Sequence, residues 1–138
     1  TLYVYAEASG VGVEIADTPA LFDTIDGTRE HTIRADSARP ETNSHMRRQG
    51  FDVRGAKKGK GSVEDGVAFL RSFERIVIHD RCRLAQQEAR LYCYETDRLT
   101  GDIKPRLRDE HNHVWDAARY ALEPLIRRRS GPLIGRAS

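Results

Sequence analysis

The 138-residue sequence lacks long apolar runs and has few cysteines, and these two absences exclude several classes of protein. No stretch approaches the roughly 20 apolar residues that cross a membrane, so we expect a chain with no membrane partner. Cys82 and Cys93 are the only cysteines. If the segment between them is helical, they lie about 16 Å apart along its axis, which is too far for a disulfide bond. They also supply too few ligands for a structural zinc site, and a reducing, intracellular setting is the simplest interpretation.

The sequence has almost no net charge, but its basic side chains are unevenly distributed. Lys and Arg number 23 against 21 Asp and Glu, which gives a formal net charge of +2. Residues 39–60 hold seven basic side chains and two acidic ones, and the last twenty residues hold five and one. Total charge therefore does not indicate a nucleic-acid-binding protein, whereas the two basic regions are candidates for such contacts.

Short apolar strands alternate with helical segments along most of the chain. We expect strands at residues 2–6, 31–35, 51–54 and 75–79, and helices at about 18–25, 40–49, 62–73 and after Asp80. Such alternation implies crossover connections and an at least partly parallel sheet, so the predicted fold class is α/β in one domain. The apolar centre of residues 75–79 favours a strand buried on both faces. We expect Asp80 and the segment Ser62–Asp65 to cap the helices that they precede.

Two further elements are expected near the C-terminus. A hairpin is predicted from about Leu91 to Leu107, and a helix begins near His113 until Pro124 disturbs it. On that helix one stripe is apolar: Val114, Ala118, Ala121, Leu122 and Leu125. The other side is polar and holds His113, Asp116, Tyr120 and Glu123. His113 and Asp116 are three residues apart and point the same way, which places an imidazole beside a carboxylate.

Asp36 supplies a second acid, directly after the strand predicted at residues 31–35. Ligands and chemistry in α/β proteins collect where strands end. The alternative for Asp36 is a helix cap, for which its spacing from Pro40 is poor. The alternative for His113 and Asp116 is a solvated helix face. We assign the tyrosines, Tyr3 and Tyr5 among them, and Trp115 to packing rather than to base stacking.

A glycine-rich basic loop, residues 55–61, separates a predicted strand from a predicted helix. It is not a phosphate-binding P-loop, because Gly61 separates Lys60 from Ser62. A flexible cationic loop suits contact with nucleic-acid phosphates, and the alternative is a charged loop without a ligand. The candidate DNA-binding residues are Arg47, Arg48, Arg54, Lys57, Lys58 and Lys60.

Two segments, Ile33–Glu41 and His113–Leu122, resemble signatures of the nuclease domain of tailed-bacteriophage large terminase subunits. The basic loop and Gly61–Gly66 are also similar to that family, so the resemblance extends to about Leu125. It implies an RNase H-like mixed sheet flanked by helices, lacking the family's N-terminal strand or strands. We expect this domain over residues 1–126 and a basic tail over residues 127–138. The implied activity is divalent-metal-dependent cleavage of concatemeric viral DNA during genome packaging.

The resemblance also implies a site in which three acids hold two Mg²⁺ or Mn²⁺ ions. Two of these acids match Asp36 and Asp116, and His113 matches a histidine beside the last, so these three are the candidate catalytic residues. Asp109 is a further candidate metal ligand, with His111 near it. The family's first aspartate lies before the position where this chain begins, as does an ATPase domain. Loss of one acid weakens a metal site, so we expect slow or undetectable cleavage by this fragment.

The implied partners are double-stranded DNA, the phage portal and the small terminase subunit, in the cytoplasm of a bacterial host. One alternative is a non-catalytic DNA-binding and assembly module that docks on portal or capsid protein through Arg127–Arg129. Another is a zinc hydrolase that uses His111, His113 and Asp116. Catalytic zinc usually has ligands that are more widely spread in sequence, which disfavours the second alternative.

Overall fold

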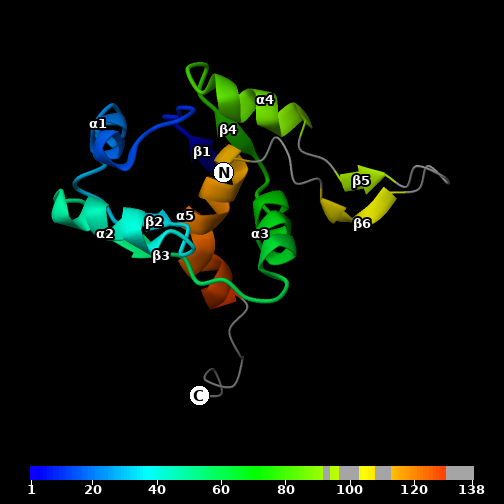
Figure 1. Ribbon diagram of the computed structural model, residues 1–138. Helices are drawn as coiled ribbons and strands as arrows, with labels where there is room; N and C mark the ends of the chain where they lie inside the picture. The colour runs from blue at the N-terminus through cyan, green and yellow to red at the C-terminus, as the bar shows by residue number, and fades with distance from the viewer. Residues whose placement is uncertain (92–93, 97–102, 108–112, 130–138) are drawn as a thin grey trace, which may run out of the picture.

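A computed structural model describes residues 1–91, 94–96, 103–107 and 113–129. In these ranges the chain alternates strands and helices, which confirms the α/β prediction (Figure 1). The strands are β1 (Leu2–Val4), β2 (Ile33–Ala35), β3 (Val53–Gly55), β4 (Ile76–Ile78), β5 (Tyr94–Thr96) and β6 (Ile103–Leu107). The helices are α1 (Thr18–Phe22), α2 (Pro40–Arg48), α3 (Ser62–Arg71), α4 (Arg83–Leu91) and α5 (His113–Arg129), and a 3-10 turn, η1 (Ile15–Asp17), precedes α1.

The described strands form three pairs. β1 and β4 are parallel, as are β2 and β3, whereas β5 and β6 form an antiparallel hairpin, as the turn residues predict. In the second pair Ile33 lies opposite Val53, and Ala35 lies opposite Gly55. Parallel pairing brings the carboxyl ends of β2 and β3 to one edge. Asp36 and the basic loop therefore leave the sheet side by side.

A hydrophobic core around β2 and β3 holds that edge of the sheet in place. Met46, Phe51 and Val53 are buried, and Phe22, Ile33 and Ala35 pack against them. The rings of Phe22 and Phe51 meet edge to face at 5.8 Å between centroids. Burial of each such side chain contributes about 1.5–3 kcal/mol. The strand that precedes Asp36 is thus held by α1, α2 and β3 together.

Helix α5 occupies the middle of the molecule and packs against α3, α4 and β2 (Figure 1). Its Trp115 and Arg119 are buried. The approach to α3 is close enough that a Cβ atom on Gly66 would lie 2.5 Å from Cδ of Arg119. Only glycine fits there without displacing Arg119, so Gly66 sets the spacing between the two helices.

Carboxylates from distant elements cap the two helices α4 and α5. Glu7 accepts the N–H groups of Leu84 and Ala85, at 2.7 and 2.8 Å. The buried Glu88 accepts those of His113 and Val114, at 3.0 and 2.6 Å. These bonds satisfy N–H groups that the first turn of a helix leaves free, and the negative charge suits the helix dipole.

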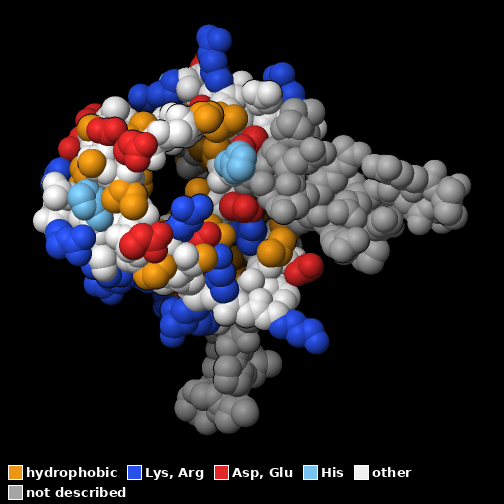
Figure 2. Space-filling model, in the orientation of Figure 1, with side chains coloured by type: hydrophobic (Ala, Val, Ile, Leu, Met, Phe, Trp, Pro, Cys, Tyr) orange, Lys and Arg blue, Asp and Glu red, His pale blue; other side chains and the backbone are white. Residues whose placement is uncertain are grey.

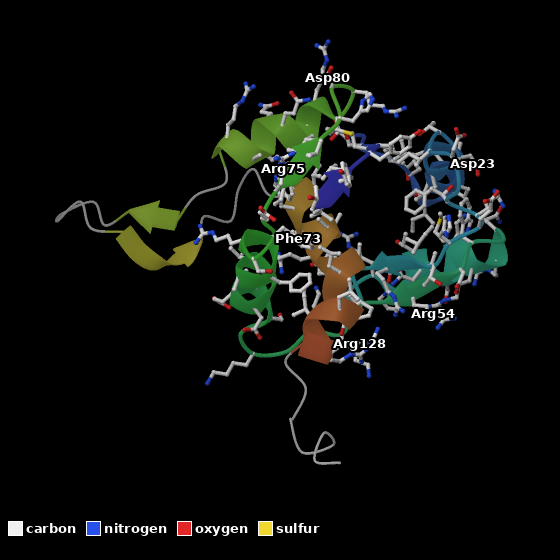
Figure 3. All side chains as sticks on the ribbon, turned by 180° about the vertical axis from the view of Figure 1, so that it is seen from behind. Asp23, Arg54, Phe73, Arg75, Asp80 and Arg128 are labelled. Atoms are coloured by element: carbon white, nitrogen blue, oxygen red, sulfur yellow. The ribbon has the colours of Figure 1, made fainter. Side chains whose placement is uncertain are left out.

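Several local predictions are wrong. Asp80 does not cap α4, because the helix begins at Arg83 and its first free N–H groups bind Glu7; Figure 3 shows Asp80 beside the start of that helix. Ser62 lies inside α3, and the cap position is Gly61, with a φ of 80° and no side-chain cap bond. Pro124 lies within α5, which continues to Arg129. A proline removes one helical hydrogen bond without ending a helix that is packed on several sides.

The prediction of a strand buried on both faces at residues 75–79 is wrong, because Val77 of β4 is 37% exposed. Tyr3 is 70% exposed, whereas Tyr5, although 61% exposed, packs against Arg81, whose Cζ lies 4.2 Å from the ring centroid. In the described part of the chain β1 and β4 pair only with each other, so their outward side chains lie uncovered. Leu125, expected in the apolar stripe of the last helix, is likewise exposed. No helix within the described ranges is long and apolar enough to cross a membrane.

Candidate functional site

A basic cavity of about 460 Å³ lies between the 55–61 loop, α3 and the second half of α5. The loop contributes three lysines, and α5 contributes two arginines and a tyrosine. The lining residues are Lys57, Lys58, Gly59, Lys60, Ser62, Asp65, Arg119, Tyr120, Glu123, Ile126 and Arg127. Its five cationic side chains outnumber its two carboxylates, Asp65 and Glu123, so the cavity attracts anions such as phosphate.

Asp36 lies beside this cavity and is bound to one of its lysines. Its Oδ1 pairs with Nζ of Lys58 and accepts the N–H of Ala38 at 2.9 Å. The hydrogen bond from Lys58, followed by that from Ala38, holds the pKa of Asp36 below its usual range. Asp36 raises the pKa of Lys58 in return, and Tyr120 adds to this effect, its ring centroid lying 5.2 Å from Nζ. Both side chains of the pair are therefore charged at neutral pH.

Asp116 is also bound to a cation that lines the cavity. Its Oδ1 pairs with the guanidinium of Arg119, one turn later on α5. Arg119 is 8% exposed, and its buried Nε has no hydrogen-bond partner among the described residues. The same guanidinium lies 5.8 Å from the centroid of the Tyr120 ring. A chain of contacts therefore runs from Asp36 through Lys58, Tyr120 and Arg119 to Asp116.

Asp36, directly after β2, and Asp116, on α5, are thus each paired with a cation that lines the same cavity. Carboxylate oxygens are the donors that Mg²⁺ and Mn²⁺ prefer, so the chemistry of the pair fits a hard divalent cation. Among the residues that the structure describes, no group of three His, Cys, Asp or Glu side chains could hold a metal. Each of Asp36 and Asp116 by itself could supply oxygen ligands to such an ion. Asp109 and His111 lie outside the described residues.

His113 lies at a different cavity. Its backbone N–H binds Glu88, and its side chain lines an apolar cavity of about 590 Å³, to which Leu2–Ser9, Ile33 and Ala117 also contribute. This apolar cavity lies between the pairs β1–β4 and β2–β3, where Figure 2 shows an opening in the surface. The zinc alternative needs His113, Asp116 and His111 in one site, and the structure describes only the first two.

The six candidate DNA-binding residues fall into two groups. Lys57, Lys58 and Lys60 line the basic cavity. The arginines lie around α2 and β3, where Figure 3 labels Arg54. Arg47 donates from Nε to the carbonyl of Val53 at 2.7 Å, Arg54 pairs with Asp52 at 3.3 Å, and Arg48 is exposed.

Sequence reasoning overlooked Arg119, Tyr120 and Arg127 as parts of the site. Their spacing carried a usable signal, because residues three and four after Asp116 share its side of a helix. Arg127 stands four residues after Glu123 and pairs with it at 3.5 Å. Cys82 is buried, and burial, followed by the charge of Glu7, raises the pKa of its thiol, which disfavours the reactive thiolate.

Comparison with known proteins finds similarity to terminase large subunits. Over 94 residues the chain is 40% identical to the terminase large subunit of Bacillus phage SPP1, which covers 66% of this chain. It is 31% identical over 94 residues, or 68% of this chain, to the PBSX phage terminase large subunit of Bacillus subtilis (strain 168). In both cases the match spans 22% of the length of the relative.

A solved structure agrees with these relatives. The nuclease domain of the large terminase of bacteriophage SPP1, crystallised with bound Mn, superposes with a TM-score of 0.72 at 34% identity. The superposition covers 82% of this chain and 64% of that one, and it confirms the predicted RNase H-like fold. Residues 2–124 match the family described as the terminase RNase H-like domain. With that match over most of its length, the chain belongs to the terminase RNase H-like domain family.

Proposed function

We propose that this chain is the DNA-cleaving nuclease domain of a terminase large subunit and cuts concatemeric viral DNA during genome packaging. The observation that carries the proposal is the pair of carboxylates, Asp36 and Asp116, held beside a cavity lined by five cations. Acids that bind metal next to cations that bind phosphate are the groups that a metal-dependent nuclease needs. The similar SPP1 nuclease domain, which carries bound Mn, supports this assignment.

In this proposal Asp36 and Asp116 are the ligands of Mg²⁺ or Mn²⁺, and Asp109 is a third candidate. Divalent ions, when bound there as a pair, would polarise the scissile phosphate and activate water. His113, at the start of α5, is proposed to position water or a phosphate oxygen, although it lines the apolar cavity rather than the basic one. Arg119, whose Nε is unpartnered in the described structure, is suited to hold Asp116 in a fixed orientation.

The DNA backbone would lie along the basic cavity. Lys57, Lys58 and Lys60 would bind phosphates without reading sequence, and Arg47, Arg48 and Arg54 would extend this contact past β3. The lysines of the cavity and the two carboxylates beside it have separate tasks in this proposal. Lysines bring the duplex to the site, and the carboxylates hold the ions that act on it.

Because the matched relatives are several times longer than this chain, we propose that it works as one part of a larger protein. That protein would include an ATPase domain before this one and would meet the portal and the small terminase subunit in the host cytoplasm. The basic residues 127–138 would form a tail after the nuclease domain, although α5 itself continues through this boundary to Arg129.

The test is cleavage of supercoiled plasmid in Mn²⁺ by the terminase subunit that contains this domain. Asp36→Asn and Asp116→Asn should each reduce cleavage at least about a hundredfold while leaving duplex binding at fixed salt nearly unchanged. Asp23→Asn is the control, since Asp23 is likewise an aspartate paired with a cationic side chain, Arg29, at 2.8 Å, but stands outside the site. Full cleavage by both site variants would refute the assignment.

The fragment of residues 1–138 should cleave slowly, because Asp36 and Asp116 match two of the three metal-binding acids that the resemblance to the family implies. Rapid plasmid digestion by the fragment in Mn²⁺ would contradict this expectation.

The competing function is a non-catalytic DNA-binding and assembly module, favoured by the fact that Asp36 and Asp116 already have cationic partners. Calorimetric titration with Mn²⁺ separates the two, because a binding module gives no response that depends on Asp36.

A further inference from the structure

Lys58 differs from the other two lysines of the basic loop. Its ammonium is bound to Asp36 and faces the ring of Tyr120. Within the described chain, neither Lys57 nor Lys60 forms an ion pair with a carboxylate, although all three line the same cavity. One lysine of the loop is thus turned toward the acid, and the other two remain available to a ligand in the cavity.

The backbone of the loop places Lys58 in this position. The N–H of Ala56 donates to the carbonyl of Ala35 at 2.7 Å, which continues the β2–β3 pairing up to Asp36. A Cβ atom on Gly55 would lie 3.1 Å from that of Ser37, so the start of the loop runs close beside the residue after Asp36. Farther along, the Cβ position of Gly59 has open space around it. The loop is therefore anchored on one side of Lys58 and has room on the other.

An ammonium on a carboxylate oxygen occupies the position that a metal ion bound to that oxygen would need. The two cations also repel each other, so both cannot sit on Oδ1 of Asp36 at once. With 38% and 39% of their side chains exposed, Lys58 and Asp36 form a pair that contributes at most about 1 kcal/mol. Such a pair keeps the carboxylate ionised and in place, yet a divalent ion can displace the lysine.

We propose that Lys58 and a divalent cation compete for Asp36, so that Lys58 is the resident counterion of the candidate metal site and leaves when metal binds. The displaced ammonium stays beside Tyr120 in the basic cavity, where it joins Lys57 and Lys60. In this way metal binding adds a third free cation to the surface that meets phosphate. Lys58 is a positioning residue in this scheme, and the inference rests on the proposed function because it takes Asp36 as a metal ligand.

The test is the affinity of residues 1–138 for Mn²⁺ alone, measured by calorimetry without DNA. Lys58→Met should bind Mn²⁺ about threefold to fivefold more tightly than the unaltered chain, which corresponds to release of a pair worth up to about 1 kcal/mol. Lys57→Met is the matched control: it removes the same charge from the adjacent position without releasing Asp36. Equal affinities for the two lysine variants, or weaker binding by Lys58→Met, would overturn the inference.

Asp36→Asn separates this inference from the proposed function. If Asp36→Asn loses Mn²⁺ binding while the two lysine variants bind alike, the metal site stands and the competition fails. If no protein responds to Mn²⁺, both fail. A second measurement needs no variant: in a Mg²⁺ titration of the unaltered chain followed by NMR, the side-chain ammonium signal of Lys58 should shift more than that of Lys57. Equal shifts would also count against competition.

Discussion

Two pairs of carboxylates in this molecule are held in opposite ways. Glu7 and Glu88 accept backbone N–H groups at the starts of α4 and α5. Asp36 and Asp116 pair with the side chains of Lys58 and Arg119, and Asp36 also accepts the N–H of Ala38. A backbone donor at a helix start cannot leave without unwinding the helix, whereas the partly exposed Lys58 can leave by rotating about single bonds. Glu7 and Glu88 therefore stabilise the fold, whereas Asp36 has a cationic partner that another cation can replace.

The largest effect is expected from Glu88→Gln, which would test the backbone-held pair. The carboxylate is 2% exposed and accepts two N–H groups, and one amide oxygen cannot replace both of its oxygens. Because hydrogen bonds to charged groups are strong, the free energy of unfolding should fall by about 2–3 kcal/mol. Urea denaturation measures this loss. A change below about 0.5 kcal/mol would remove the distinction between the two pairs.

A smaller loss of folding stability is expected from Gly66→Ala, which would disturb the ion pair between Arg119 and Asp116. The new Cβ would meet Cδ and Cγ of Arg119 at 2.5 and 2.9 Å, so either α3 moves from α5 or Arg119 turns away from Asp116. Overpacking of this kind costs about 1–3 kcal/mol. Gly59→Ala is the control, because the Cβ position there is open. Equal free energies of unfolding for the two variants in urea would show that the close approach of α3 and α5 contributes nothing to stability.

Asp36→Asn should change stability by less than about 1 kcal/mol at neutral pH, in contrast to Glu88→Gln. The pair with Lys58 is more than one-third exposed and therefore screened by solvent, and an asparagine oxygen can still accept the N–H of Ala38. Thermal and urea unfolding at low and high salt would measure the difference. A loss above about 2 kcal/mol would mean that Asp36 is a structural carboxylate, like Glu88.

The smallest effect is expected at acidic pH and concerns Asp23, an aspartate outside the site that pairs with Arg29. The hydrogen bond from Arg29 lowers the pKa of Asp23 in the folded protein. Its contribution to stability is therefore present above the pKa of the unfolded chain and lost as the pH falls through the lower folded value, below about pH 4. Asp23→Asn should flatten this acid limb slightly. An unchanged pH profile of the melting temperature below pH 5 would contradict the prediction.

The order of elements was predictable from the sequence because it depends on local signals. Pro40 at its start and Gly50 after its end predicted α2, and the β-branched run around Ile76 predicted a strand that the structure confirms. The caps were not predictable in the same way. Glu7 lies 77 residues before Leu84, to which it bonds, and no local pattern indicates a partner at that distance.

For the candidate site, the sequence indicated the acids and the lysines but not how they are joined. Asp36 and Lys58 are 22 positions apart, and they meet because β2 and β3 pair in parallel register. Arg119 was passed over because an arginine on an amphipathic helix usually faces solvent. Here it is buried against Gly66, a position whose importance depends on packing between α3 and α5.

The central place of α5 links the two cavities mechanically. His113 and Ala117 line the apolar cavity, whereas Arg119 and Tyr120 line the basic one, and one rigid helix carries all four. Since successive residues of a helix are about 100° apart around its axis, a turn of the whole helix moves both sets of side chains by the same angle. A substitution that displaces α5 as a rigid body would therefore alter the linings of both cavities together.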